Sequence, residues 1–125
     1  MNTKVGSIRE LNVYQLSLNT ALEIHQLTKQ FPVEEKYSLI DQIRRSSRSV
    51  CTNLAEAWRK RKYQAVFINK LTDAAQEAAE TQTWLEFAFK FQYINEETFK
   101  TLDEQYEHIY AMLITMERKV ELFCK

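Results

Sequence analysis

The sequence predicts an all-α fold: an up-down-up-down antiparallel bundle of four long helices. The 125 residues include one glycine and one proline, whereas sheet proteins place these residues at their many turns. Apolar residues recur at steps of three and four through four successive stretches, which is typical of amphipathic helices. A chain of this length forms one domain with its own core, and a 45% hydrophobic composition excludes wholesale disorder.

The first ten residues predict a flexible tail, and the bundle is expected to span 11–125. The first helix is expected at about 11–30. Its core row is Val13, Leu16, Thr20, Ile24, Leu27 and Phe31. A second apolar row, which points away from the first, is Leu11, Tyr14, Leu18 and Leu22. Because one bundle core needs only one row, the second is either a flank of the bundle or a subunit interface.

Pro32 ends the first helix, and the second is expected at about 33–59 with Glu34 and Glu35 in its first turn. The short connection makes the two helices antiparallel neighbours. The core row of the second helix is Ile40, Ile43, Ser47, Val50, Leu54 and Ala57. A break is expected between Arg59 and Lys62, because four adjacent positive charges repel one another.

The third helix is expected at about 63–92. Its core row is Phe67, Leu71, Ala74, Ala78, Thr81, Leu85 and Ala88. Alanines in the middle allow a neighbouring helix to approach closely. A second row is aromatic: Trp84, Phe87 and Phe91. Aromatic residues at this spacing belong either to the core or to a protein interface, where Trp and Phe are enriched.

Asn95 is the expected N-cap of the fourth helix, at about 95–124. Its core row repeats every seven residues, a spacing that favours coiled-coil-like packing at small crossing angles. The row is Phe99, Leu102, Tyr106, Ile109, Leu113, Met116, Val120 and Phe123.

Charge is divided along the chain although the formal net charge is zero. Residues 41–62 carry seven basic and two acidic side chains, and residues 73–125 carry five basic and eleven acidic ones. The seven basic residues, here called the basic strip, are Arg44, Arg45, Arg48, Arg59, Lys60, Arg61 and Lys62. This strip is either solvated or internally paired, or it contacts nucleic-acid phosphates. Trp58 and Tyr63 beside it either stack on bases or, for Trp58, join the core.

Features of enzymes are missing from the sequence, so we expect no catalytic residue, cofactor or metal. Di-iron bundles use Glu-x-x-His motifs, but the residues three before His25 and His108 are Leu22 and Gln105. One glycine cannot build a phosphate-binding loop. Two distant cysteines, Cys51 and Cys124, indicate free thiols in a reducing compartment. No segment is apolar enough to cross a membrane, so a cytoplasmic protein is expected.

The sequence resembles a known family in segments spread over nearly the whole chain. They are Phe31-Pro32, Glu35, Tyr37, Gln42-Ile43-Arg44-Arg45, Ser49-Val50, Asn53-Leu54-Ala55-Glu56 and Phe67. The family is that of bacterial 23S rRNA intervening-sequence proteins, four-helix bundles that include the accessory variability protein of diversity-generating retroelements. The resemblance implies a homopentameric barrel, nucleic-acid (RNA or DNA) binding and, in the retroelement branch, a reverse-transcriptase partner.

Carried over residue by residue, the resemblance implies that Arg44, Arg45 and Arg48 form the nucleic-acid surface. It implies a structural role for the signature residues Gln42, Asn53 and Glu56. Cys51-Thr52 stands where the family often has a proline, and Ala57 stands where it usually has glycine. Both differences remove helix breakers and predict a straighter second helix.

Two functions are therefore expected as alternatives. One is a non-enzymatic homo-oligomeric bundle that binds nucleic acid weakly, without sequence preference, through the basic strip. The other is a structural or protein-interaction module, in which the basic strip pairs with acidic surfaces of neighbouring subunits or of a protein partner.

Overall fold

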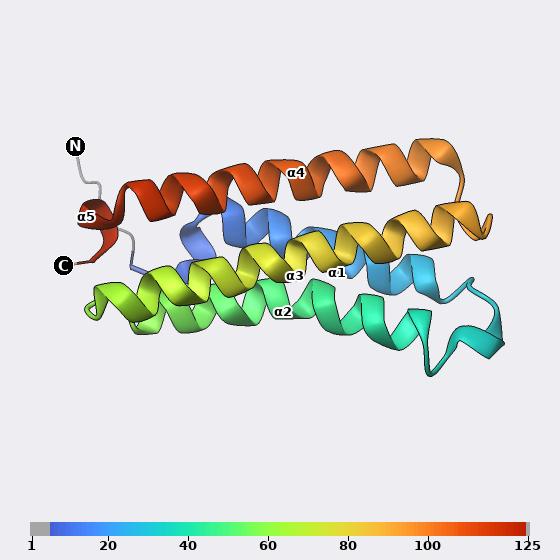
Figure 1. Cartoon of the computed structure of the whole chain (residues 1–125), viewed down its shortest axis with the longest axis horizontal. Coiled ribbons are helices and arrows are strands. Elements are labelled where there is room, and N and C mark those ends of the chain that lie inside the picture. Colours follow the sequence, from blue (N-terminus) through green and yellow to red (C-terminus); the bar gives the residue numbers. More distant parts are fainter. Residues whose placement is uncertain (1–5, 125) are drawn as a thin grey trace.

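The computed structural model describes residues 6–124, which form an all-α bundle without strands in that range. The four long helices are α1 (Asn12–Thr28), α2 (Leu39–Arg59), α3 (Gln64–Lys90) and α4 (Glu96–Arg118). Three short elements are the 3₁₀ helices η1 (Ile8–Glu10) and η2 (Val33–Glu35), and α5 (Val120–Phe123). Figure 1 shows the long helices side by side, with connections at alternate ends, as in an up-down-up-down bundle.

Each long helix packs against two others, in the cyclic order α1, α2, α3, α4. Every predicted core position of α3 is buried, as are most of those on the other three helices. The largest fully buried side chains include Phe67, Leu71, Tyr106 and Leu113. Removal of this apolar surface from water is the main driving force for the fold.

The contact between α2 and α3 is the most extensive in the bundle. On α3 it is made close by small buried residues, Ala74 and Ala78. The next core position along α3 makes a buried polar contact, in which Thr81 Oγ1 donates to Ser46 Oγ at 2.8 Å. Both side chains are completely buried, so each hydroxyl depends on a protein partner for its hydrogen bond.

Helix α2 begins at Leu39, six residues later than predicted, because Glu35 redirects the chain. Its Oε1 accepts hydrogen bonds from Ser38 Oγ at 2.6 Å and from the Leu39 N–H at 3.3 Å. Its Oε2 accepts from the Tyr93 hydroxyl at 2.8 Å. A side chain that accepts from the first N–H groups of a helix acts as its cap, so Glu35 precedes α2 instead of lying within it.

Beyond its start, α2 is unbroken through Cys51 and Ala57 and ends at Arg59, where the sequence predicts a break. Helix α4 ends at Arg118, and Lys119 separates it from α5, so the helix predicted to residue 124 is interrupted. Residues 1–5 of the predicted tail lie outside the described residues. Of its remainder, Ile8–Glu10 forms η1, capped by Ser7.

The turn between α3 and α4 uses two recognisable caps. Gln92 has a positive φ of 66°, and the Tyr93 N–H donates to the Ala88 carbonyl at 2.8 Å, as in a Schellman motif. Asn95 Oδ1 then accepts from the Thr98 N–H at 2.8 Å. Asn95 is therefore the N-cap of α4, as predicted.

Acid should weaken the fold through Glu35. Hydrogen bonds from Ser38, Tyr93 and the Leu39 N–H hold the pKa of Glu35 below its ordinary value of 4.5. The stability that these bonds provide is present above pH 4.5 and is lost as the pH falls through the lowered pKa. We expect urea unfolding followed by circular dichroism to show a steeper loss of unfolding free energy below pH 4.5 in the wild type than in Glu35→Gln.

The control is Tyr93→Phe, which removes one hydrogen bond and keeps the carboxylate. It should reduce this acid-dependent loss without abolishing it. Parallel stability curves for the wild type and Glu35→Gln would contradict the role of Glu35.

Candidate functional site

Arg44 of the basic strip holds the end of α1. Its Nε donates to Thr28 Oγ1 at 2.8 Å, and its Nη2 donates to the carbonyl of His25 at 3.4 Å. The last carbonyls of a helix lack partners within the helix and attract cations. Arg44 is half-buried in this position, so its first role is to fasten α2 to the C-terminus of α1.

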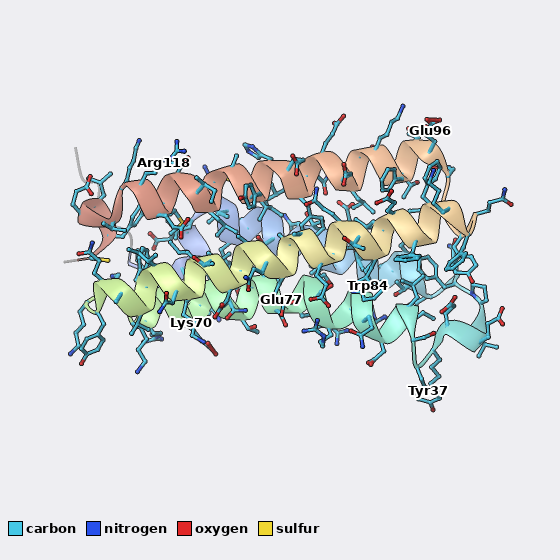
Figure 2. All side chains as sticks on the ribbon, viewed as in Figure 1. Tyr37, Lys70, Glu77, Trp84, Glu96 and Arg118 are labelled. Carbon is cyan, nitrogen blue, oxygen red and sulfur yellow. The ribbon has the colours of Figure 1, made fainter. Side chains whose placement is uncertain are left out.

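Arg45 is paired with α3. Its guanidinium lies 3.1 Å from Glu77 Oε2 and 2.5 Å from Glu80 Oε1. The hydrogen bonds to Glu77 and Glu80 raise the pKa of Arg45. Figure 2 shows Glu77 on the side of α3 that faces α2. For this residue the internally paired interpretation is the correct one.

Arg48 is exposed and contacts α1 instead. Its Nη2 donates to Nδ1 of His25 at 3.2 Å. Because a guanidinium has no acceptor, Nδ1 carries the lone pair and the proton of the neutral ring is on Nε2. Partial burial lowers the pKa of His25, and the charges of Arg44, Lys29 and Arg48 lower it further.

The four remaining basic residues lie where α2 ends. Arg61 is tied down: its guanidinium lies 4.1 Å from the centre of the Trp58 ring, and Nη1 donates to the Trp58 carbonyl at 2.8 Å. Arg59, Lys60 and Lys62 are exposed, and none forms an ion pair within residues 6–124. Trp58 is buried in the core, whereas 53% of the Tyr63 surface is exposed.

The aromatic row of α3 lies largely on the surface. Phe87 and Phe91 are 46% and 53% exposed, and Trp84 is half-buried, with Nε1 donating to Glu80 Oε1 at 3.3 Å. Successive rings in this row are 5.9 Å apart, and Phe91 lies 5.5 Å from Tyr93. The core interpretation is wrong for Phe87 and Phe91. Figure 2 shows Trp84 on the flank of α3 next to α2.

The second apolar row of α1 is divided. Leu11 and Tyr14 are half-buried and pack against the core, which makes this part a flank of the bundle. Leu18 and Leu22 are 41% and 57% exposed. They leave an apolar surface on α1 that no described residue covers.

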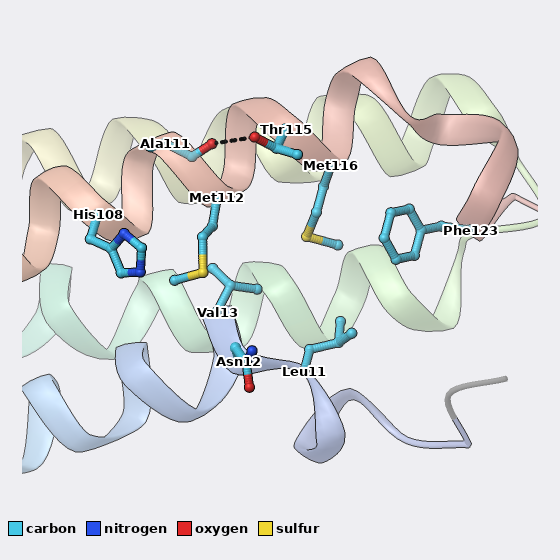
Figure 3. A pocket seen from close by; sticks show the side chains of 9 residues that line it. All are labelled: Leu11, Asn12, Val13, His108, Ala111, Met112, Thr115, Met116 and Phe123. Carbon is cyan, nitrogen blue, oxygen red and sulfur yellow. Dashed lines mark hydrogen bonds between the residues drawn. The ribbon is translucent and has the colours of Figure 1, made fainter. Parts of the chain in front are cut away.

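A shallow apolar groove lies between the start of α1 and the end of α4 (Figure 3). Its walls include Leu11, Met112, Met116 and Phe123, and His108 lies at one end. The groove was not predicted from the sequence, because Met116 and Phe123 belong to the predicted core row of the fourth helix, Leu11 belongs to the second row of the first helix, and Met112 belongs to neither. Within the part of the chain that the structure describes, no three His, Cys, Asp or Glu side chains are arranged to hold a metal. No described helix is long and apolar enough to cross a membrane.

Comparison with known proteins matches the profile of the 23S rRNA-intervening sequence protein family to residues 9–115. The chain belongs to this family. A similar solved structure is a Bacteroides thetaiotaomicron protein of unknown function from the S23 ribosomal protein family. It is 34% identical, with a TM-score of 0.77 over 86% of this chain and 96% of the other. No functionally curated protein matches the chain.

Two of the signature residues, Asn53 and Glu56, make contacts on the flank of α2 that faces α3. Asn53 Nδ2 donates to the Ser49 carbonyl of its own helix at 2.9 Å. Glu56 forms an ion pair with Lys70 of α3 at 2.8 Å, and Figure 2 marks Lys70 on that helix. Gln42 is half-buried.

Arg44 anchors the end of α1 whereas Arg59 is exposed, so substitution of these two residues should affect stability differently. Arg44→Ala removes two hydrogen bonds from a charged donor, one to Thr28 Oγ1 and one to the His25 carbonyl, so it should cost about 1–3 kcal/mol of unfolding free energy. Arg59→Ala removes an exposed charge and should stay within about 0.5 kcal/mol of the wild type. Chemical denaturation of both variants measures the difference. Equal stability of the two would show that Arg44 does not anchor α1.

Proposed function

We propose that this protein is a non-enzymatic, homo-oligomeric helical bundle that binds nucleic acid weakly and without sequence preference. One observation carries the proposal. Arg48, Arg59, Lys60 and Lys62 are exposed and form no ion pair within the described residues. These four, here called the open basic residues, supply positive charge to phosphates, whereas Arg44 and Arg45 are already occupied.

The placement of these charges suits a phosphate backbone better than bases. Arg59 follows Arg48 by eleven positions on one helix, a rise of roughly 16 Å. That length spans several phosphates, because each strand of a duplex carries one phosphate per roughly 3.4 Å of helix axis. Contacts of this kind position a nucleic acid but carry no sequence information. The exposed ring of Tyr63 lies next to Lys62, whose Nζ is 5.1 Å from its centre, and offers a surface for stacking an unpaired base.

Salt dependence tests the proposal. The double variant Lys60→Gln/Lys62→Gln removes two phosphate contacts, and each contact contributes about 0.7 to the slope of log affinity against log salt for a single strand. We therefore expect the slope to fall by about 1.4. The measurement is the fluorescence anisotropy of labelled single-stranded RNA and DNA over a series of salt concentrations.

The matched control is Lys90→Gln/Lys100→Gln. It removes the same charge from exposed lysines at the end of α3 and the start of α4, away from the open basic residues. This variant should keep the wild-type slope. Absence of wild-type binding at low salt, or equal losses in both double variants, would overturn the proposal.

Self-assembly is supported by the exposed apolar surface. Phe87 and Phe91 on α3, and Leu18 and Leu22 on α1, present large apolar groups to solvent. The rings of Phe87 and Phe91 lie 5.9 Å apart. Exposed apolar patches commonly mark protein interfaces, and aromatic residues are enriched at the centres of interfaces. The family resemblance implies a pentamer. The alternative function is a structural or protein-interaction module in which the basic strip pairs with acidic surfaces of neighbouring subunits or of a protein partner, and the same exposed apolar surface favours it.

Charge placed in the aromatic row should dissociate the oligomer. In Phe87→Glu/Phe91→Glu, two carboxylates would have to be buried at the interface without partners, which is costly. We expect light scattering to show a lower mass than for the wild type, with helicity retained in circular dichroism.

Tyr110→Glu is the control, because Tyr110 is 45% exposed on α4 and lies outside this row. It should leave the mass unchanged. A monomeric wild type, or an unchanged mass in the double variant, would contradict assembly through α3. Loss of RNA binding together with assembly would show that the binding surface forms only in the oligomer.

A further inference from the structure

Four basic side chains converge where the end of α1 crosses the middle of α2. His25 lies in the last turn of α1, Lys29 is the C-cap of α1, and Arg44 and Arg48 come from α2. Arg48 donates to the ring of His25, and Arg44 donates to its carbonyl. The positive charges of Arg44, Lys29 and Arg48 all act on the imidazole.

Acidic groups do not neutralise this cluster within residues 6–124. Asp41 lines the same groove of α2 as Arg44 and Arg48, but it forms no ion pair with either. Glu97 of α4 faces Glu23 on the opposite flank of α1. Arg9 and Glu10 of η1 precede the other end of α1. His25 is therefore surrounded by cations on the side that faces α2.

We propose that His25, Lys29, Arg44 and Arg48 form a proton-linked site for a backbone phosphate of nucleic acid, with His25 as the group that takes up the proton. This inference rests on the proposed function and extends its surface from α2 onto α1. Arg44 contributes its charge while it holds the end of α1. Lys29 and Arg48 are exposed and are able to turn toward a ligand.

The proton linkage follows from the geometry of His25. Without ligand the ring is neutral, because Arg48 donates to its Nδ1 and because partial burial and the three cations keep its pKa below 6.5. A phosphate adds negative charge beside these cations and favours the imidazolium. The ring then takes a proton from solvent at Nδ1, Arg48 turns to the phosphate, and both ring N–H groups become donors.

Proton uptake by His25 determines the direction in which the affinity for nucleic acid changes with pH. Between the lowered pKa of His25 without ligand and its higher pKa in the complex, the complex holds one more proton than the unliganded protein. Affinity for nucleic acid therefore increases as the pH falls through this interval. Each unit by which the phosphate raises the pKa corresponds to about a tenfold gain in affinity.

The chain contains two histidines, which provides a matched control. His25→Gln keeps an acceptor for Arg48 but cannot be protonated. His108→Gln removes the histidine of α4 at the edge of the apolar groove, far from this cluster. Affinity for labelled single-stranded RNA is measured at constant ionic strength, in buffers without phosphate, at pH values on both sides of 6.5.

We expect the wild type and His108→Gln to bind RNA more tightly as the pH falls, and His25→Gln to show a flat profile. In NMR spectra, the pKa of the His25 ring should rise when RNA is added. Binding that is independent of pH in the wild type, or a slope that persists in His25→Gln, would overturn the proton-linked site and leave the proposed function intact. Absence of RNA binding at every pH would overturn both.

Discussion

The rotational position of α2 about its own axis controls the surface chemistry of this protein. Burial of Ile43, Val50 and Leu54, which are completely inaccessible to solvent, fixes that position. Each residue advances about 100° around a helix. Arg44 therefore projects toward α1, Arg45 toward α3, and Arg48 toward the solvent-exposed edge of α1. A run of basic residues in the sequence is thereby divided among three environments.

Because of that division, the number of basic residues on α2 is larger than the number whose charge is free at the surface. Arg45 is balanced by two carboxylates of α3, and Arg44 is directed at backbone and hydroxyl oxygens of α1. Arg61 stacks on Trp58. The charge of Arg48, Arg59, Lys60 and Lys62 remains exposed and without an ion pair within the described residues.

The local features of the fold were predictable from sequence, whereas its long-range contacts were not. Every core position of α3 and the Asn95 cap followed from the period of the helix and from capping chemistry. Glu35, which caps the start of α2, also accepts a hydrogen bond from Tyr93, a residue distant in sequence. Exposure of Phe87 and Phe91 depends on which flanks α2 and α4 cover. The contact of His25 with Arg48 requires the register of two helices, which a single-helix pattern does not contain.

The hydrogen bond between Thr81 and Ser46 has a consequence for the alignment of α2 with α3. An alanine-rich surface is smooth, and a seven-residue apolar repeat packs almost as well after a slide of one repeat. Such a slide would break the hydrogen bond between the two hydroxyls, at a cost of about 0.5–1.5 kcal/mol, and would leave Thr81 with the Glu77 carbonyl and Ser46 with the Ile43 carbonyl as partners within their own helices. The hydrogen bond between Thr81 and Ser46 thus favours one alignment of α2 with α3. The same alignment places Arg45 beside Glu77 and Glu80.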